Sequence, residues 1–231
     1  MDVDYRLIAE LPEKADIILK HWGLMDYFLP ADLPLIVLER YDRAAFQEKF
    51  RGLDALKDKL SAHVLTHKTA VAAFAEAKKG LYKRMKHFRW IMAGYWRGSH
   101  YFSGVPLLPG LGVGDDLFFD PAVRMRITWR KIAAVDPLPP GAVVAMDDGY
   151  GAEDFARDLQ ALRDLREDEA LAALDVRIVR SELAFLYAEL VGVVMAYGHS
   201  ARGRLPADAP LIALIPRTWK QRTIEANAVT D

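Results

Sequence analysis

The fold is decided by residues 153–204, EDFARDLQALRDLREDEALAALDVRIVRSELAFLYAELVGVVMAYGHSARGR. No proline interrupts this stretch, and apolar residues recur every seven positions in two series that lie three residues apart. Glu169 alone breaks the first series. This pattern predicts one long helix with an apolar seam that other parts of the chain must cover. The first series contains Leu162, Val176, Leu183, Leu190 and Tyr197, and the second Leu165, Ala172, Val179, Leu186 and Val193.

A second seven-residue series lies earlier in the chain and predicts a long helix over 33–97, with Asp32 as its N-cap. Breaks near Gly52 or over 61–69 are the alternatives. Continuity is preferred, because neither place has the cluster of Pro, Gly and Asn that makes a turn. The series consists of Phe46, Leu53, Leu60, His67, Phe74, Leu81, Phe88 and Tyr95.

The remaining segments are shorter. Pro12 is expected to divide the N-terminal region into two helices, 5–11 and 13–29. Residues 98–151 hold many of the glycines and prolines and are predicted to be an irregular connector.

Within this connector, Pro121 after a capping Asp120 predicts a helix over 121–135. The alternating residues 123–127 and the run 142–146 also permit short strands. After the second long helix we expect a short helix over 207–215 and a loose tail over 217–231.

Charge indicates how the two long helices pair. Residues 78–97 contain seven Lys or Arg and no acidic residue, whereas 153–169 is rich in Asp and Glu. An antiparallel pair would place the basic end beside the acidic start, and the connector would only have to bridge neighbouring ends. We therefore predict an all-α, elongated bundle built on two long antiparallel helices, as a single domain over 1–216.

Composition narrows the class of protein. The hydrophobic share is 52% and the formal net charge is −1, which argues against disorder and gives no overall attraction to nucleic acid or anionic lipid. The absence of cysteine excludes disulfides and thiolate chemistry and favours a reducing compartment, so a cytoplasmic location is expected. Residues 183–201 carry only one charge, Glu189. They continue the apolar seam, and we interpret them as a buried bundle helix rather than a membrane span.

One stretch has the composition of an anion-binding surface. Cations in 78–97 alternate with aromatic residues, an arrangement that suits phosphates or single-stranded bases. The alternative is that the acidic start of the second long helix neutralises them. Because the net charge is near zero, nucleic acid is the less favoured partner. The candidate anion-binding residues are Lys78, Lys79, Lys83, Arg84, Lys86 and Arg89.

Other chemistry has weaker signals. His63 and His67 are one helical turn apart and could supply half of a zinc site, but the sequence offers no third ligand nearby, and His67 falls on the apolar series. The glycine run 110–114 lacks the lysine and hydroxyl residue of a phosphate-binding loop. Ser99 and Ser103 lack the surroundings of a nucleophile elbow. We predict no catalytic residue, cofactor or metal.

Five tryptophans and ten phenylalanines exceed what a two-helix seam can bury, so part of the apolar surface should meet another copy or another protein. The sequence therefore favours a non-enzymatic structural or scaffolding protein that forms a homo-oligomer through helix faces. A module that binds an anionic partner through 78–97 is the second hypothesis, and a metal-binding helical bundle is the third.

Overall fold

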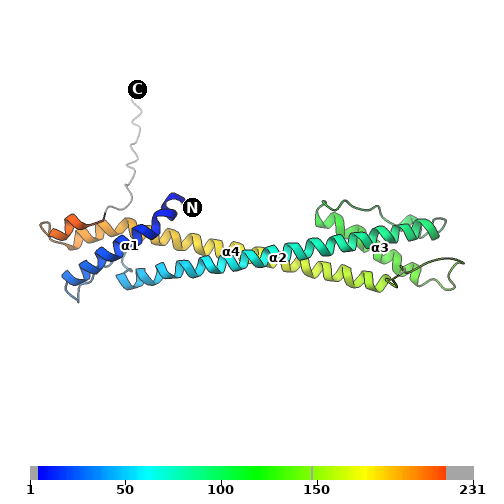
Figure 1. Ribbon diagram of the computed structural model, residues 1–231, viewed down its shortest axis with the longest axis horizontal. Helices are drawn as coiled ribbons and strands as arrows, with labels where there is room; N and C mark the ends of the chain where they lie inside the picture. The colour runs from blue at the N-terminus through cyan, green and yellow to red at the C-terminus, as the bar shows by residue number, and fades with distance from the viewer. Residues whose placement is uncertain (1–4, 147, 217–231) are drawn as a thin grey trace, which may run out of the picture. The chain divides into compact units, whose positions relative to one another are not determined.

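The computed structural model describes residues 5–146 and 148–216, and this part of the chain is all-helical, as predicted (Figure 1). No strand occurs in it, although an isolated bridge joins Val37 to Tyr41. The predicted tail over 217–231 lies outside the described residues. The helices are α1 (Tyr5–Phe28), α2 (Arg43–Tyr95), α3 (Asp115–Ala133) and α4 (Ala152–Arg204), with 3-10 turns η1 (Phe102–Gly104) and η2 (Pro210–Leu214).

The chain separates into two compact units. The single domain over 1–216 stays a prediction. Unit 1 combines Met1–Ala62 with Arg177–Asp231, and unit 2 is His63–Val176. Each unit has its own cluster of buried apolar side chains. Between Leu53 and Phe74, α2 has no buried side chain, so no core residue of α2 lies in the stretch where the units divide.

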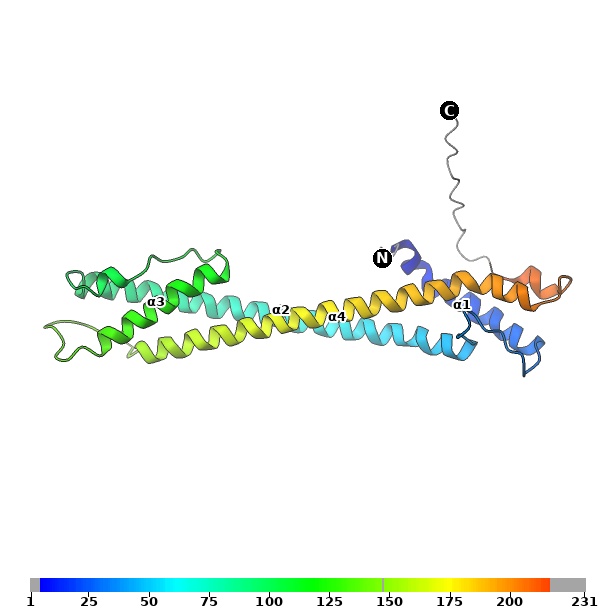
Figure 2. The same ribbon diagram turned by 180° about the vertical axis from the view of Figure 1, so that it is seen from behind.

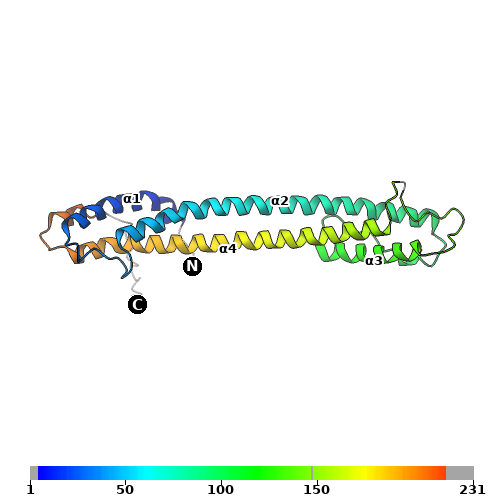
Figure 3. The ribbon, with the colours of Figure 1, turned by 90° about the horizontal axis from the view of Figure 1, so that it is seen from below.

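In unit 1, α1 lies along the first part of α2 and the last part of α4 (Figure 2, Figure 3). The two helices predicted on either side of Pro12 are one helix. A proline inside a helix removes one hydrogen bond and costs about 3 kcal/mol. A buried stripe begins at Leu11, next to the proline, and continues along the helix after it. Its members are Leu11, Ala15, Ile18, Trp22 and Met25.

Helix α2 begins at Arg43, ten residues later than the start predicted at 33. The N-cap is Asp42 rather than Asp32, because an Asp42 carboxylate oxygen accepts a hydrogen bond from the backbone N–H of Ala45 at 2.7 Å. The residues before it form an irregular segment whose Leu35, Val37 and Tyr41 are buried. From Arg43 the helix is continuous through Gly52 and through 61–69.

In unit 2, α3 packs against the second part of α2 and the first part of α4. It begins at Asp115 instead of 121, because Gly114 ends the preceding loop and the two aspartates at the start of the helix suit its N-terminal dipole. Trp129 of α3 is fully buried and contacts both other helices of unit 2. The centre of its ring lies 4.5 Å from that of Phe88 of α2, on which it stacks, and 5.6 Å from that of Phe155 of α4.

The stretch 142–146 forms no strand. Two of its backbone carbonyls instead accept hydrogen bonds from indole N–H groups. Trp96 donates to the Val143 carbonyl at 2.9 Å, and Trp129 donates to the Val144 carbonyl at 2.6 Å. Side chains of α2 and α3 thus hold the connector in place within unit 2.

After α4, the helix predicted over 207–215 is only the 3-10 turn η2. A buried histidine of α1 contacts it. His21 Nδ1 lies 2.8 Å from the Tyr197 hydroxyl, and His21 Nε2 lies 3.4 Å from the Leu211 carbonyl. The end of the described chain is therefore tied to both α1 and α4.

Candidate functional site

An open groove of about 1150 Å³ lies in unit 1 between the first part of α2 and the last part of α4. We call it the unit 1 groove. Helix α1 packs in the buried core of unit 1 and contributes no residue to it. The residues that line it include Ala45, Gly52 and Leu56 of α2, and Ile178, Ser181 and Phe185 of α4.

The lining of the groove includes a large exposed apolar side chain, Phe185, and we call the lining at this residue the edge and the lining at Gly52 the floor. Phe185 is 81% exposed. A Cβ atom added at Gly52 would meet no heavy atom within 4 Å. The small residues Gly52, Ala45 and Ser181 thus leave space that a side chain from outside unit 1 can enter.

Glu189 lies at one end of the groove and is surrounded by donors. The hydroxyl of Tyr41 donates a short hydrogen bond to it, Arg40 Nη2 lies 2.9 Å away, and Lys49 Nζ lies 3.5 Å away. The Tyr41 hydrogen bond is the largest effect that lowers the pKa of Glu189. Burial, followed by the same hydrogen bond, raises the pKa of Tyr41 to about 12. This end of the groove therefore holds an ionised carboxylate that its hydrogen-bond and ion-pair partners keep in place.

The turn that carries Arg40 and Tyr41 has a strained backbone. Leu38 and Glu39 both have positive φ, 52° and 62°, a region that costs a non-glycine residue about 1–3 kcal/mol. The turn is closed by two backbone hydrogen bonds between Val37 and Tyr41, at 2.8 and 3.0 Å. Its ion pair and hydrogen bond to Glu189 offset part of the strain.

Apolar and charged residues together line the unit 1 groove. An amphipathic helix laid in a groove is a recurring mode of recognition in which apolar anchors supply affinity and charges at the rim set the orientation. The apolar edge at Phe185 and the charged end at Glu189 supply both elements.

Most of the predicted seam residues are buried inside the two units. Leu60 and Leu183 are half-buried, and Tyr95, which ends the series in α2, is exposed. The buried members include Phe46, Leu53, Phe74, Leu81, Phe88, Leu162, Val176 and Leu190, and also Ala172, Val179, Val193 and Tyr197.

The six candidate anion-binding residues divide into two groups. Three of them hold the connector. Lys78 Nζ contacts Asp115 at 3.1 Å, Arg84 contacts Asp148 at 2.7 Å, and Arg89 donates to the carbonyl of Pro106 at 3.3 Å. The other three are exposed: Lys79, Lys83 and Lys86.

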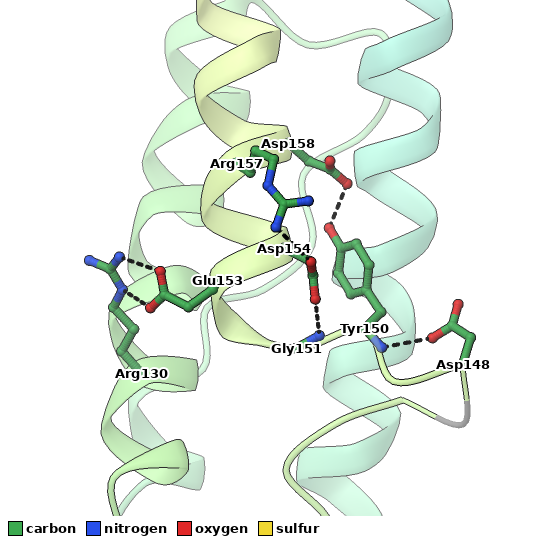
Figure 4. Close-up of polar contacts among 8 residues, drawn as sticks. All are labelled: Arg130, Asp148, Tyr150, Gly151, Glu153, Asp154, Arg157 and Asp158. Atoms are coloured by element: carbon green, nitrogen blue, oxygen red, sulfur yellow. Dashed lines mark hydrogen bonds and ion pairs between the residues drawn. The ribbon is translucent and has the colours of Figure 1, made fainter.

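The acids at the start of α4 have other partners than the basic end of α2. Glu153 pairs with Arg130 of α3 at 3.1 Å, and Asp158 accepts a hydrogen bond from the Tyr150 hydroxyl at 2.7 Å (Figure 4). Burial is the largest effect that raises the pKa of Tyr150, and the bond to Asp158 adds to it. Asp154 accepts the backbone N–H of Gly151 and pairs with Arg157 of its own helix (Figure 4).

His63 and His67 of α2 are placed differently from a metal site. His63 Nδ1 lies 3.6 Å from Asp175 of α4, and both histidines are half-buried. Within residues 5–146 and 148–216, no group of three or more histidine, aspartate and glutamate side chains is arranged to hold a metal ion.

The polar end of the groove was not predicted from the sequence. Glu189 had a signal, because it is the one charge in 183–201, but nothing in the sequence indicates that Tyr41 and Arg40 reach it. The turn at Leu38 and Glu39 also has no signal, since neither residue type favours positive φ.

The chain matches no protein-family model, and neither the curated proteins nor the solved structures contain a significant match to it. None of the helices in the part of the chain that the structure describes is long and apolar enough to cross a membrane.

Proposed function

We propose that this chain is a structural protein that associates with a second copy of itself through the unit 1 groove. The observation that carries the proposal is the exposure of Phe185 beside the open floor at Gly52. Burying a phenylalanine side chain contributes about 1.5–3 kcal/mol, which unit 1 alone leaves unrealised. A large apolar side chain at the rim of an empty groove is typical of an interaction surface.

A second copy is the occupant that we favour, because the surface is complementary to itself. A two-fold interface pairs the same patch from both subunits, so that it must carry both the projecting and the receiving parts. Phe185 projects and the floor at Gly52 receives. Glu48 of α2 and Arg177 of α4 also line the groove, and neither has an ion-pair partner among the described residues. A two-fold arrangement would bring these opposite charges together.

The proposal includes the two long, heptad-patterned helices as an antiparallel pair. In its support, Lys49 of α2 pairs with Glu189 of α4, and Lys59 pairs with Glu182, so that the contacts in unit 1 advance along α2 as they go back along α4. The expected cytoplasmic location stays a prediction from the cysteine-free composition.

The test is light scattering coupled to size-exclusion chromatography, at low and at high salt. We expect a defined oligomer that survives high salt, because the interface is mainly apolar. The Phe185→Asp variant should be a monomer. Tyr27→Asp is the matched control, since Tyr27 is 84% exposed in the same unit but lies outside the groove. A wild-type monomer at high micromolar concentration, or an equal loss of assembly in both variants, would contradict the proposal.

A further inference from the structure

One face of α2 in unit 2 carries cations that unit 2 does not use. We call it the basic face, and it consists of Lys79, Lys83, Lys86 and Trp90 of α2 together with Arg97, which follows the end of the helix at Tyr95. The four helical positions are three or four residues apart and therefore share one side of the helix. The opposite side is the buried one, with Leu81, Met85, Phe88 and Met92. Between 79 and 97 the sequence contains no acidic residue.

The basic face is not neutralised by the acids of the described residues. Lys83, Lys86 and Arg97 have no ion-pair partner within residues 5–146 and 148–216, and Lys79 has only a contact of 3.8 Å with Glu76 of its own helix. The acidic start of α4, which the sequence offered as the neutralising segment, is engaged with Arg130, Tyr150 and its own first turn (Figure 4). These cations are therefore available to an external anion.

An aromatic platform lies among them. Trp90 is 62% exposed, and the Lys86 ammonium lies 5.2 Å from the centre of its ring. The next turn presents Ala93 and Gly94, and a Cβ added at Gly94 would meet nothing within 4 Å. The indole is thus open to a flat ligand beside a positive charge.

We infer that the basic face binds single-stranded nucleic acid, with a base stacked on Trp90 and phosphates on Lys83, Lys86 and Arg97. Cations that follow the backbone together with an exposed aromatic ring are what sequence-independent binding of single strands requires. A bilayer surface fits less well, because a helix that lies in a membrane needs an apolar face, and Trp90 is the only large apolar side chain here. Duplex binding would leave the exposed indole without a role.

The experiment measures the anisotropy of a labelled oligouridylate of about 20 nucleotides, a length that matches several site sizes of single-strand binders, titrated with the full chain at several salt concentrations. We expect binding that weakens steadily with salt. Lys83→Glu combined with Lys86→Glu should lower the affinity at least about tenfold and reduce the salt slope by about 1.4, since each phosphate contact on a single strand contributes about 0.7. The matched control is Lys68→Glu with Lys131→Glu, which makes the same charge change at exposed sites of the same unit.

Trp90→Ala tests the stacking separately from charge. It should lower the affinity about tenfold without changing the salt slope, and Trp90→Phe should keep most of the binding. Unchanged far-ultraviolet circular dichroism shows that each variant is folded. Gly52→Leu, which alters only the unit 1 groove, should bind the oligonucleotide like the wild type, so that this inference and the proposed self-association can fail independently.

Four results would overturn the inference. The first is no binding at low salt with protein at about 100 µM, the weak end of non-specific affinities. The second is an equal loss in the Lys68 and Lys131 control, which would make net charge the only cause. The third is full affinity in Trp90→Ala. The fourth is binding to vesicles of phosphatidylserine and phosphatidylcholine without binding to the oligonucleotide, which would assign the face to anionic membranes.

Discussion

The substitution Gly52→Leu separates the stability of unit 1 from its association. Gly52 lies inside α2 on the floor of the unit 1 groove, and a Cβ there would meet no atom within 4 Å. The larger side chain can therefore be accommodated by the folded monomer. It would occupy the space into which Phe185 of a second copy is proposed to insert.

Gly52→Leu should stabilise the monomer and weaken its association with a second copy. Leucine has a better helix propensity than glycine by about 0.8 kcal/mol, so the free energy of unfolding of the monomer should rise by about that amount. For a chain of this size the increase corresponds to a rise in Tm of about 2–3 °C. The dimer should lose the burial of two Phe185 side chains, about 3–6 kcal/mol, which raises the dissociation constant by about two to four orders of magnitude.

The assays are urea denaturation at submicromolar protein concentration, where the monomer dominates, and light scattering or sedimentation at high concentration. Gly80→Leu is the matched control. Gly80 is also inside α2, and its added Cβ would also meet nothing within 4 Å, but it lies in unit 2 and away from the groove. Both variants should be more stable than the wild type, and only Gly52→Leu should fail to associate.

Two results would refute this reasoning. If Gly52→Leu assembled with the wild-type dissociation constant, the groove floor would not be part of the interface. If it lowered the free energy of unfolding while Gly80→Leu raised it, the space at Gly52 would not be open in the folded monomer.

Three further predictions concern stability. Glu189→Gln should remove one part of the pH dependence of stability, which denaturation from pH 3 to 7 measures. The folded-state pKa of Glu189 is lowered from 4.5, so its contribution to the free energy of unfolding is fully present above pH 4.5 and is lost as the pH falls through the folded-state pKa. Asp42→Ala should lower the free energy of unfolding by about 1 kcal/mol through loss of the α2 cap, while Asp32→Ala should change it by less than about 0.5 kcal/mol; equal effects would contradict the placement of the cap. Trp129→Phe should cost about 2 kcal/mol in urea denaturation because it removes a buried hydrogen bond and part of a fully buried ring, whereas Trp90→Phe at an exposed site should stay within about 0.5 kcal/mol.

The seams were accessible to sequence reasoning because burial along a helix follows a fixed period. Phe46, Leu53 and Phe74 were identified from spacing alone, and they are buried. The residues at which the helices begin and end were harder to predict from the sequence than the buried positions. Pro12 lies inside α1 and does not end it, and the burial of this helix from Leu11 onward depends on what packs against it.

Charge was the least predictable feature. The sequence places bases at the end of α2 and acids at the start of α4. Glu153 and Asp158 of α4 nevertheless contact Arg130 and Tyr150, which both lie outside the basic stretch. A charged side chain can reach several partners, and its choice depends on distances of a few ångströms that no periodicity encodes. Exposed pairs are also weak, so that small differences in geometry decide among them.

The sequence by itself determined the all-helical class, the long uninterrupted stretches and the residues that face inward, because these follow from propensity and from the helical repeat. Only the tertiary structure decided which surfaces remain open. The unit 1 groove needs segments of α2 and α4 that are far apart in the chain, and Tyr41 meets Glu189 across 148 positions. The basic face is defined in the same way, by which cations the connector and α3 leave unpaired. Such relations are contacts between distant residues, and local pattern contains no information about them.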